Sequence, residues 1–241
     1  MKDYHTSITN KNLKYLNSHY IPSMLYHYTK HEIALKIKSS GELWAYDLFS
    51  MNDKNEVWLG YELFKNMIRK KKLKRHLDTV ANFVESEIKQ RRTIKFYVSC
   101  FTESEYNGRH CRVYGRENVG IRKESIKLCD QHIHLGLNSV NMNQFYILPV
   151  NYSRNVQERR LNDLVNSYVK LHDEIFLRFK QNGTEEMRHL LLGVFQTVVT
   201  LSALYKEQKY SWEKEFRGIV FHTTGEPLEC SSGRKFLKLS V

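Results

Sequence analysis

The chain has 241 residues, of which 41% are hydrophobic and 12% aromatic, and this composition excludes an intrinsically disordered protein, which buries too little apolar surface to fold. Lysine and arginine number 38 against 26 acidic residues, which gives a formal net charge of +12 and favours a polyanionic partner such as nucleic acid or an acidic protein. The length fits one domain, and no proline- or glycine-rich linker divides the sequence. We therefore expect a single domain over residues 1–241.

The sequence also favours a cytoplasmic protein. The most apolar window, residues 189–205, contains polar side chains and is shorter than the ~20 residues that a membrane span requires. Residues 1–14 lack the apolar core of a signal peptide. The cysteines form no CxxC pair and are too sparse for a disulfide scaffold, at Cys100, Cys111, Cys129 and Cys230.

In the first half of the chain we expect a short helix at 12–19 and an apolar, aromatic strand at 23–28. A helix should follow that strand and end at Gly41, because glycine is typical of the residue after a helix. Residues 42–49 predict another strand, and a second long helix should begin near Asn52. Residues 93–102 form the clearest strand of the chain, rich in β-branched and aromatic side chains.

In the second half, a loop at 103–118 should lead to a short strand at 119–122, with further strands at 132–137, 144–152, 214–222 and 235–240. Two helices are expected at 155–181 and 184–207, and the second is apolar on nearly all sides, so it should be central or contact a partner. Because helices interrupt the strands without regular βαβ alternation, the pattern favours an α+β fold.

Common catalytic motifs are missing from the sequence. It contains no phosphate-binding GxxxxGK[ST] loop, no GxGxxG fingerprint and no HExxH or GxSxG motif. Cys129, His132 and His134 could supply three metal ligands, but a fourth is missing, so we expect no metal site.

Two segments have residue types that suit a reactive site. His27 is a polar residue at the end of an apolar strand and before a helix, where ligands often bind; a core histidine satisfied by a backbone carbonyl is the alternative. In a strand, Glu213, Glu215 and Arg217 would share one face. Two carboxylates and an arginine make a poor core but a reasonable site, and an exposed face with a salt bridge is the alternative.

A basic segment at 67–76 is a candidate nucleic-acid surface, although a solvated helix face would have the same composition. Its candidate phosphate contacts are Arg69, Lys70, Lys71, Lys72, Lys74 and Arg75.

The order and spacing of several short motifs resemble a bacterial family of unknown function that has an H-Y-T start and a W-x-x-E-x-E-x-R ending. The resemblance covers about residues 25–225 and is carried by LYHYT (25–29), SGELWAYDLFSMND (40–53), FYVSCFTE (96–103), VYG…VGI (113–121) and YSWEKEFRGIV (210–220). That family is in turn similar to an outlying branch of the ADP-ribosyltransferase superfamily. The resemblance implies a mixed, split β-sheet core with inserted helices, and NAD as a substrate.

The resemblance also implies roles for individual residues. His27 would hydrogen-bond the adenosine ribose of NAD, with Tyr28 and Thr29 beside it and Ser99 in support. Tyr114 would stack on nicotinamide, and Glu215 would be the catalytic glutamate. For the remaining two residues, the chemistry leads us to expect that Glu213 positions or deprotonates the acceptor, and that Arg217 steadies a carboxylate or binds a phosphate.

The expected acceptor is nucleic acid or an acidic protein, and this branch would accommodate a toxin or a phage-defence enzyme. Two other functions stay open: a non-catalytic nucleic-acid-binding module, and a metal-independent hydrolase or nuclease that uses the same histidine and glutamates. The apolar helix at 184–207 leaves room for a homodimer or a neutralising partner.

Overall fold

The computed structural model describes residues 4–13, 20–50, 55–70, 75–90, 95–128, 145–179, 184–222, 228–229 and 235–241. The helices are α1 (Tyr4–Leu13), α2 (His31–Ser40), α3 (Asn55–Lys70), α4 (Arg75–Gln90), α5 (Gly108–Val113), α6 (Arg154–Phe179) and α7 (Thr184–Ala203), with short 3-10 helices η2 (Leu48–Ser50), η3 (Lys123–Ser125) and η5 (Gln208–Glu213). The strands are β1 (Met24–Thr29), β2 (Glu42–Asp47), β3 (Lys95–Thr102), β4 (Glu117–Arg122), β5 (Lys127–Leu128), β6 (Phe145–Pro149), β7 (Glu215–His222), β8 (Leu228–Glu229) and β9 (Lys235–Ser240).

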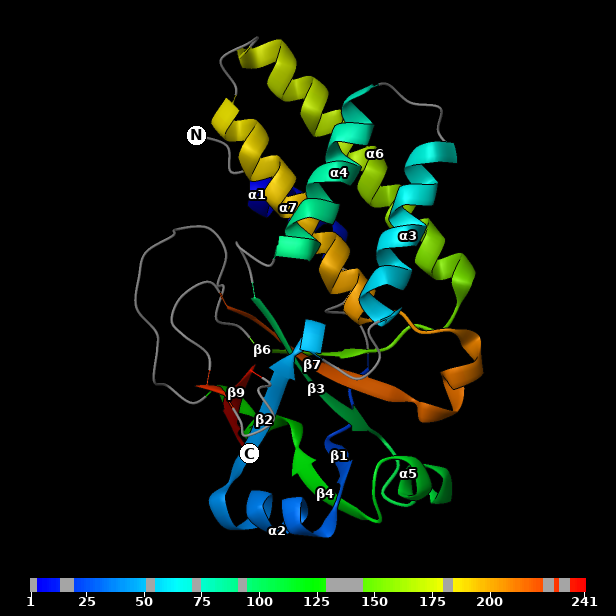
Figure 1. Cartoon of the computed structure of the whole chain (residues 1–241), viewed down its shortest axis with the longest axis vertical. Helices are drawn as coiled ribbons and strands as arrows, with labels where there is room; N and C mark the ends of the chain where they lie inside the picture. The colour runs from blue at the N-terminus through cyan, green and yellow to red at the C-terminus, as the bar shows by residue number, and fades with distance from the viewer. Residues whose placement is uncertain are drawn as a thin grey trace.

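The fold is α+β, as the sequence predicts. Figure 1 shows α1, α3, α4, α6 and α7 gathered at one end of the molecule, the sheet below them, and α2 and α5 at the opposite end. The sheet has the strand order β4-β1-β3-β2-β9-β5, and β7 lies between β3 and β6.

Every pairing between the described strands is antiparallel, so the expectation of a mixed sheet was wrong. The helical connection through α2 does make β2 run in the same direction as β1, because both are antiparallel to β3. In the described part of the chain these two strands do not pair with each other, since both lie along β3.

One edge of β3 is divided between two strands. β7 pairs with β3 along the whole of residues 95–102, so the other partners share the opposite edge. On that edge β2 pairs with residues 97–98 and β1 pairs with Thr102. Residues 99–101 lie between the two pairings, and we call this interval the seam. The sheet is therefore split at the seam.

The two faces of the sheet pack against different cores. Alternation along β3 directs Phe96 and Val98 to the large helical core, and Tyr97 and Phe101 to a smaller core that includes side chains of α2. Between the helices, α7 contacts α1, α3, α4 and α6 and is buried along nearly all of its length from Leu190 onward. This confirms the prediction that the apolar helix is central.

A close approach of α3 to α7 gives the first testable prediction. A Cβ atom added at Gly60 would lie 2.6 Å from the Cα atom of Ser202 on α7, so Gly60→Ala has to push the helices apart. We expect a loss of about 1–3 kcal/mol in the free energy of unfolding, measured by urea denaturation. Gly108→Ala is the matched control, because no atom lies within 4 Å of its added Cβ; equal stability of both variants would contradict the prediction.

Most predicted elements are confirmed within a few residues: β1, α2, β2, β3, β4, β6, α6, α7, β7 and β9. Gly41 follows α2 in the left-handed conformation, with φ 64°, as expected for a helix-terminating glycine. The described N-terminal helix is Tyr4–Leu13, and residues 14–19 of the helix predicted at 12–19 lie outside the described residues. Helices α4 and α5 were not predicted. The predicted strand at 132–137 lies outside the described residues. None of the helices in the described ranges has the length and apolar character that crossing a membrane requires.

Candidate active site

The two glutamates of the candidate site belong to different elements. Glu213 is the last residue of η5, and Glu215 is the first residue of β7. Between them Lys214 adopts the left-handed conformation, with φ 44°, which turns the chain and breaks the alternation of a strand. The predicted continuous strand through Glu213 was therefore wrong. The carboxylates nevertheless come together, because the turn at Lys214 brings Glu213 back toward Glu215.

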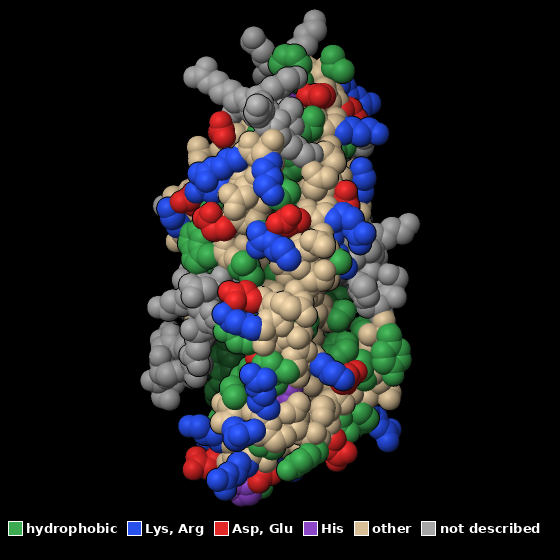
Figure 2. Space-filling model, turned by 90° about the vertical axis from the view of Figure 1, so that its right-hand side faces the viewer, with side chains coloured by type: hydrophobic (Ala, Val, Ile, Leu, Met, Phe, Trp, Pro, Cys, Tyr) green, Lys and Arg blue, Asp and Glu red, His purple; other side chains and the backbone are tan. Residues whose placement is uncertain are grey.

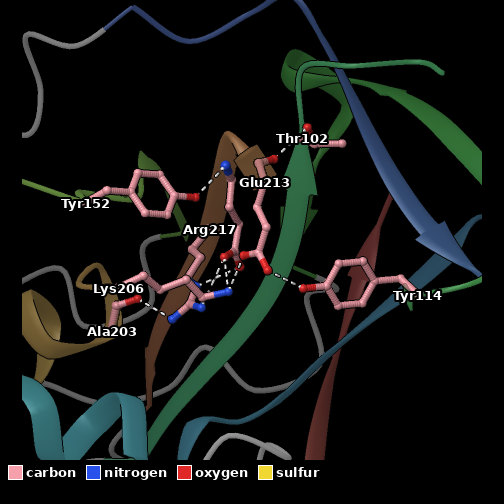
Figure 3. A network of polar contacts seen from close by, with 8 residues as sticks. Thr102, Tyr114, Tyr152, Ala203, Lys206, Glu213 and Arg217 are labelled. Carbon is pink, nitrogen blue, oxygen red and sulfur yellow. Dashed lines mark hydrogen bonds and ion pairs between the residues drawn. The ribbon is translucent and has the colours of Figure 1, made fainter. Parts of the chain in front are cut away.

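Both carboxylates bind one ammonium group. The Nζ atom of Lys206 lies 2.6 Å from Oε2 of Glu213 and 2.7 Å from Oε2 of Glu215. Arg217 donates from Nε to Oε1 of Glu215 at 2.8 Å, and its Nη1 donates to the carbonyl oxygen of Ala203, at the end of α7, at 2.6 Å. Figure 3 shows this network of polar contacts between β7 and the end of α7.

The network is buried. Arg217 is 1% exposed and Glu215 7% exposed, so the alternative of an exposed strand face with a salt bridge does not hold. Burial by itself raises the pKa of Glu215, but the positive charges of Arg217 and Lys206 outweigh it and lower that pKa from 4.5 to about 2. Glu215 is therefore an ionised carboxylate at neutral pH.

Two tyrosines and a threonine form hydrogen bonds with Glu213 and Glu215. The Tyr114 hydroxyl donates to Oε1 of Glu213 at 2.7 Å, and the Tyr152 hydroxyl accepts from the backbone N–H of Glu215 at 3.0 Å. Thr102 donates to the carbonyl oxygen of Glu213 at 3.1 Å. Burial and the hydrogen bond to Glu213 raise the pKa of Tyr114, so its phenol stays protonated. The residue as a whole remains 43% exposed.

The residue after Tyr114 is a glycine in a conformation that other residues rarely adopt. Gly115 has φ 137°, and a Cβ atom added there would lie 2.1 Å from the carbonyl oxygen of Thr29. Only glycine lets the chain pass so close to the end of β1. This contact fixes the backbone next to Tyr114, whose hydroxyl bonds Glu213.

The side chain of His27, on β1, reaches into the seam. Its Nδ1 is 2.9 Å from the carbonyl oxygen of Cys100, as in the alternative of a histidine satisfied by a backbone carbonyl. A carbonyl only accepts, so Nδ1 carries the proton, and Nε2 of the neutral ring is an acceptor. Burial lowers the pKa of His27, which favours this neutral form. Ser99 also belongs to the seam, and its hydroxyl donates to the carbonyl oxygen of Trp44 on β2 at 3.0 Å.

Strand alternation places His27 and Glu215 on opposite faces of the sheet. Tyr26, Thr102 and Glu215 lie opposite one another in the strand register and share a face. The ring of His27 lies on the other face and contacts Phe101, with centroids 6.2 Å apart. The structure therefore brings together Glu213, Glu215, Arg217 and Tyr114, and separates them from His27 by β3.

The other two proposed ligand contacts on β1, Tyr28 and Thr29, are buried. Tyr28 stacks on His110, with ring centroids 5.0 Å apart, and its hydroxyl donates to the carbonyl oxygen of Glu105 at 2.8 Å. Thr29, like Tyr28, is less than a tenth exposed. Tyr28 therefore packs against α5, and the side chain of Thr29 is enclosed by protein atoms.

Part of the basic segment falls outside the described residues. Arg69 and Lys70 are exposed in the last turn of α3, and Arg75 is the first residue of α4. Lys71, Lys72 and Lys74 are not described. On the face drawn in Figure 2, lysine and arginine side chains are spread over the surface and interspersed with acidic ones.

Several residues of the site region were not among the predicted site residues, including Lys206, Tyr152, His110 and Trp212. No local pattern marks Lys206, which follows the end of α7. His110 lies against Trp212, with ring centroids 5.1 Å apart, and the guanidinium carbon of Arg109 lies 4.0 Å from the centre of the Trp212 ring. The aromatic letters of segments 106–114 and 210–212 were the available signal, but their contact depends on the tertiary fold.

Among the described residues, no group of three or more histidine, cysteine, aspartate or glutamate side chains could hold a metal ion. The segment 129–134 lies outside the described residues. Comparison of the chain with models of protein families, with curated proteins and with solved structures gave no match.

Proposed function

We propose that the chain is an NAD-dependent ADP-ribosyltransferase in which Glu215 is the catalytic carboxylate. The observation that carries the proposal is the state of Glu215, a buried and ionised carboxylate at the first residue of a central strand. The family resemblance puts the catalytic glutamate at the start of a late strand. The split of the sheet at the seam, with His27 inside it, supports a split sheet of the transferase type.

The chemistry requires a carboxylate that is charged before the substrate arrives. When the bond between nicotinamide and ribose C1′ breaks, the electron pair leaves with nicotinamide and positive charge develops on the ribose. A carboxylate that accepts a hydrogen bond from the ribose 2′-hydroxyl stabilises this charge more in the transition state than in the ground state. Arg217 holds Glu215 by two hydrogen bonds, so the carboxylate is oriented in advance.

Glu213 is the proposed base for the acceptor. It lies beside Glu215 on the same ammonium group, where it can take the proton that the acceptor releases as its nucleophilic atom bonds to C1′. The ring of the half-exposed Tyr114, bonded to Glu213, is the candidate for stacking on nicotinamide. Nucleic acid or an acidic protein is the proposed acceptor because of the +12 charge, and a toxin or phage-defence role would follow from such a target.

The adenosine half of NAD is assigned to His27. The neutral ring presents Nε2 as an acceptor for a ribose hydroxyl, and Tyr28 and Thr29 lie next to it in β1. Since His27 and Glu215 face opposite sides of β3, the dinucleotide has to reach across the seam in order to contact both.

The proposal is tested by nicotinamide release from NAD by the purified protein, alone and with RNA, DNA or an acidic protein. Turnover supports the transferase, and the additive that accelerates it identifies the acceptor class. If no condition gives turnover and NAD leaves the melting temperature unchanged, the proposal is rejected and non-catalytic binding of nucleic acid becomes the better hypothesis.

Substitution of His27 tests how NAD is held. His27→Asn keeps an N–H near the position of Nδ1 for the Cys100 carbonyl and removes Nε2. Loss of one hydrogen bond should raise KM for NAD about 3- to 10-fold with little change in kcat. His27→Gln retains a polar atom near the position of Nε2 and should recover part of the binding. His31→Ala, at an exposed residue of α2 paired with Glu117, is the control. An unchanged KM in His27→Asn would remove His27 from the binding site.

A further inference from the structure

Lys206 is fixed in place by its backbone and nearly buried. Its N–H donates to the carbonyl oxygen of Asn151 at 3.2 Å, and its own carbonyl oxygen accepts from Nε2 of Gln157 at 3.0 Å. Its side chain is 10% exposed. The ammonium group therefore leaves a rigid segment after α7 and meets the carboxylates at a defined point.

Lys206 is a cation that joins the two glutamates. Nζ of Lys206 contacts carboxylate oxygens of both Glu213 and Glu215, and Arg217 binds Glu215 as well. The two carboxylates and the two cations balance in charge. Without Lys206, two adjacent buried carboxylates would face one arginine, and one of them would have to take up a proton.

Within the described ranges, the other titratable groups near the pair do not replace this charge. They come from several elements around it: Cys100 on β3, His110 and Tyr114 at α5, Tyr152 after β6 and Tyr210 on η5. The phenols and the thiol are neutral or negative. Burial lowers the pKa of His110, although the charge of Glu213 opposes this, so the imidazole is a poor substitute for a fixed cation.

We infer that Lys206 is a positioning residue that keeps the carboxylates of Glu213 and Glu215 ionised and side by side. Its catalytic meaning rests on the proposed function, because an oxocarbenium-like transition state needs Glu215 charged and the acceptor needs Glu213 as a base. Its electrostatic role belongs to the folded protein and can be measured without any substrate.

The test compares melting temperatures from pH 5 to pH 8 for wild type, Lys206→Met, Lys206→Arg and the double variant Lys206→Met/Glu213→Gln. In Lys206→Met one carboxylate should have a folded-state pKa above its unfolded value. Such a group is protonated in the folded protein at low pH and costs stability as pH rises through the gap between the two values. The deficit in Tm relative to wild type should therefore grow between pH 5 and pH 8 by about 3–5 °C for each unit by which that pKa exceeds 5.

The double variant separates charge from packing. Removing the charge of Glu213 should abolish the growth of the deficit with pH, and Lys206→Arg should restore the wild-type profile. Lys209→Met is the control. It removes a lysine three residues further along the chain that is 62% exposed and paired with Glu207, and the change of Tm with pH should stay as in the wild type. A deficit in Lys206→Met that is constant with pH, or one that the double variant deepens at pH 8, overturns the inference.

Activity provides a second arm. If the wild type releases nicotinamide, Lys206→Met should lower kcat more than it raises KM, and its kcat should rise with pH where that of the wild type does not. Lys206→Arg should restore the wild-type dependence of kcat on pH. An unaltered pH profile in Lys206→Met contradicts the positioning role. If the wild type releases none, the proposed function fails by itself, and the stability measurements still decide the role of Lys206.

Discussion

Replacing Glu215 with glutamine is expected to lower kcat for nicotinamide release by about 10²- to 10³-fold, the usual effect of removing one preorganised group that stabilises transition-state charge. Glutamine keeps the shape of the side chain and removes its charge. A neutral amide cannot balance the positive charge that develops on the ribose, so the loss should appear in kcat rather than in KM for NAD. The measurement is a steady-state assay of nicotinamide formation.

Two controls separate this effect from loss of the fold. Glu207→Gln removes a carboxylate that is 55% exposed and paired with Lys209, and turnover should not change. Because Glu215→Gln also leaves two cations with one carboxylate, its far-UV circular dichroism and Tm have to be recorded beside the kinetics. Full turnover in a folded Glu215→Gln protein would exclude Glu215 as the catalytic residue.

Replacing Arg217 with methionine should have the largest effect on stability, a loss of about 3–5 kcal/mol in the free energy of unfolding at pH 7, typical of breaking a buried ion pair. The change removes the hydrogen bonds to Glu215 and leaves the carbonyl oxygen of Ala203 without its guanidinium donor. Urea denaturation measures the loss. Arg188→Met is the control, because that exposed arginine pairs with Glu185 only at 3.9 Å and should cost less than about 1 kcal/mol.

The stability loss should depend on pH in a defined direction. In the wild type, the folded-state pKa of Glu215 is depressed to about 2 from 4.5, so its contribution to stability is present above pH 4.5 and disappears as pH falls toward 2. Arg217→Met loses much of this contribution. The difference between the two proteins should therefore shrink between pH 4.5 and pH 2. A loss below 1 kcal/mol at neutral pH would mean that β7 does not depend on this contact.

The sequence was most informative where the local pattern and the tertiary structure agree. The β-branched and aromatic run at 93–102 became β3, and the helix that is apolar on all sides became the buried α7. The sequence does not predict α4 as a separate helix, because the basic run at 67–76 continues the helix expected from Asn52 without a clear break. The short helix α5 was missed because it lies in a glycine- and charge-containing loop, where Asn107 caps it by accepting from two backbone N–H groups.

At the site, the sequence predicted the convergence of Glu213, Glu215 and Arg217 but not its cause. Strand alternation correctly predicted that the two carboxylates lie together. The cause is different, because the turn at Lys214 brings Glu213 toward Glu215. The position of His27 on the far face of β3 depends on the strand register, which local letters do not encode. Lys206 joins the site from the segment after α7, so only the tertiary structure could show it.

The place of β7 in the sheet has a consequence for how the protein folds. This strand comes late in the sequence yet lies between β3 and β6, and the bond from Thr102 to Glu213 joins residues 111 positions apart. A central strand that is synthesised late leaves the long edge of β3 uncovered on the ribosome, and such long-range pairing slows folding. The carboxylate pair is completed by the same docking event, because Glu213, Glu215 and Arg217 arrive with β7. A nascent chain therefore has no assembled site until it has been made through Arg217, so any reactivity has to wait for β7 to dock.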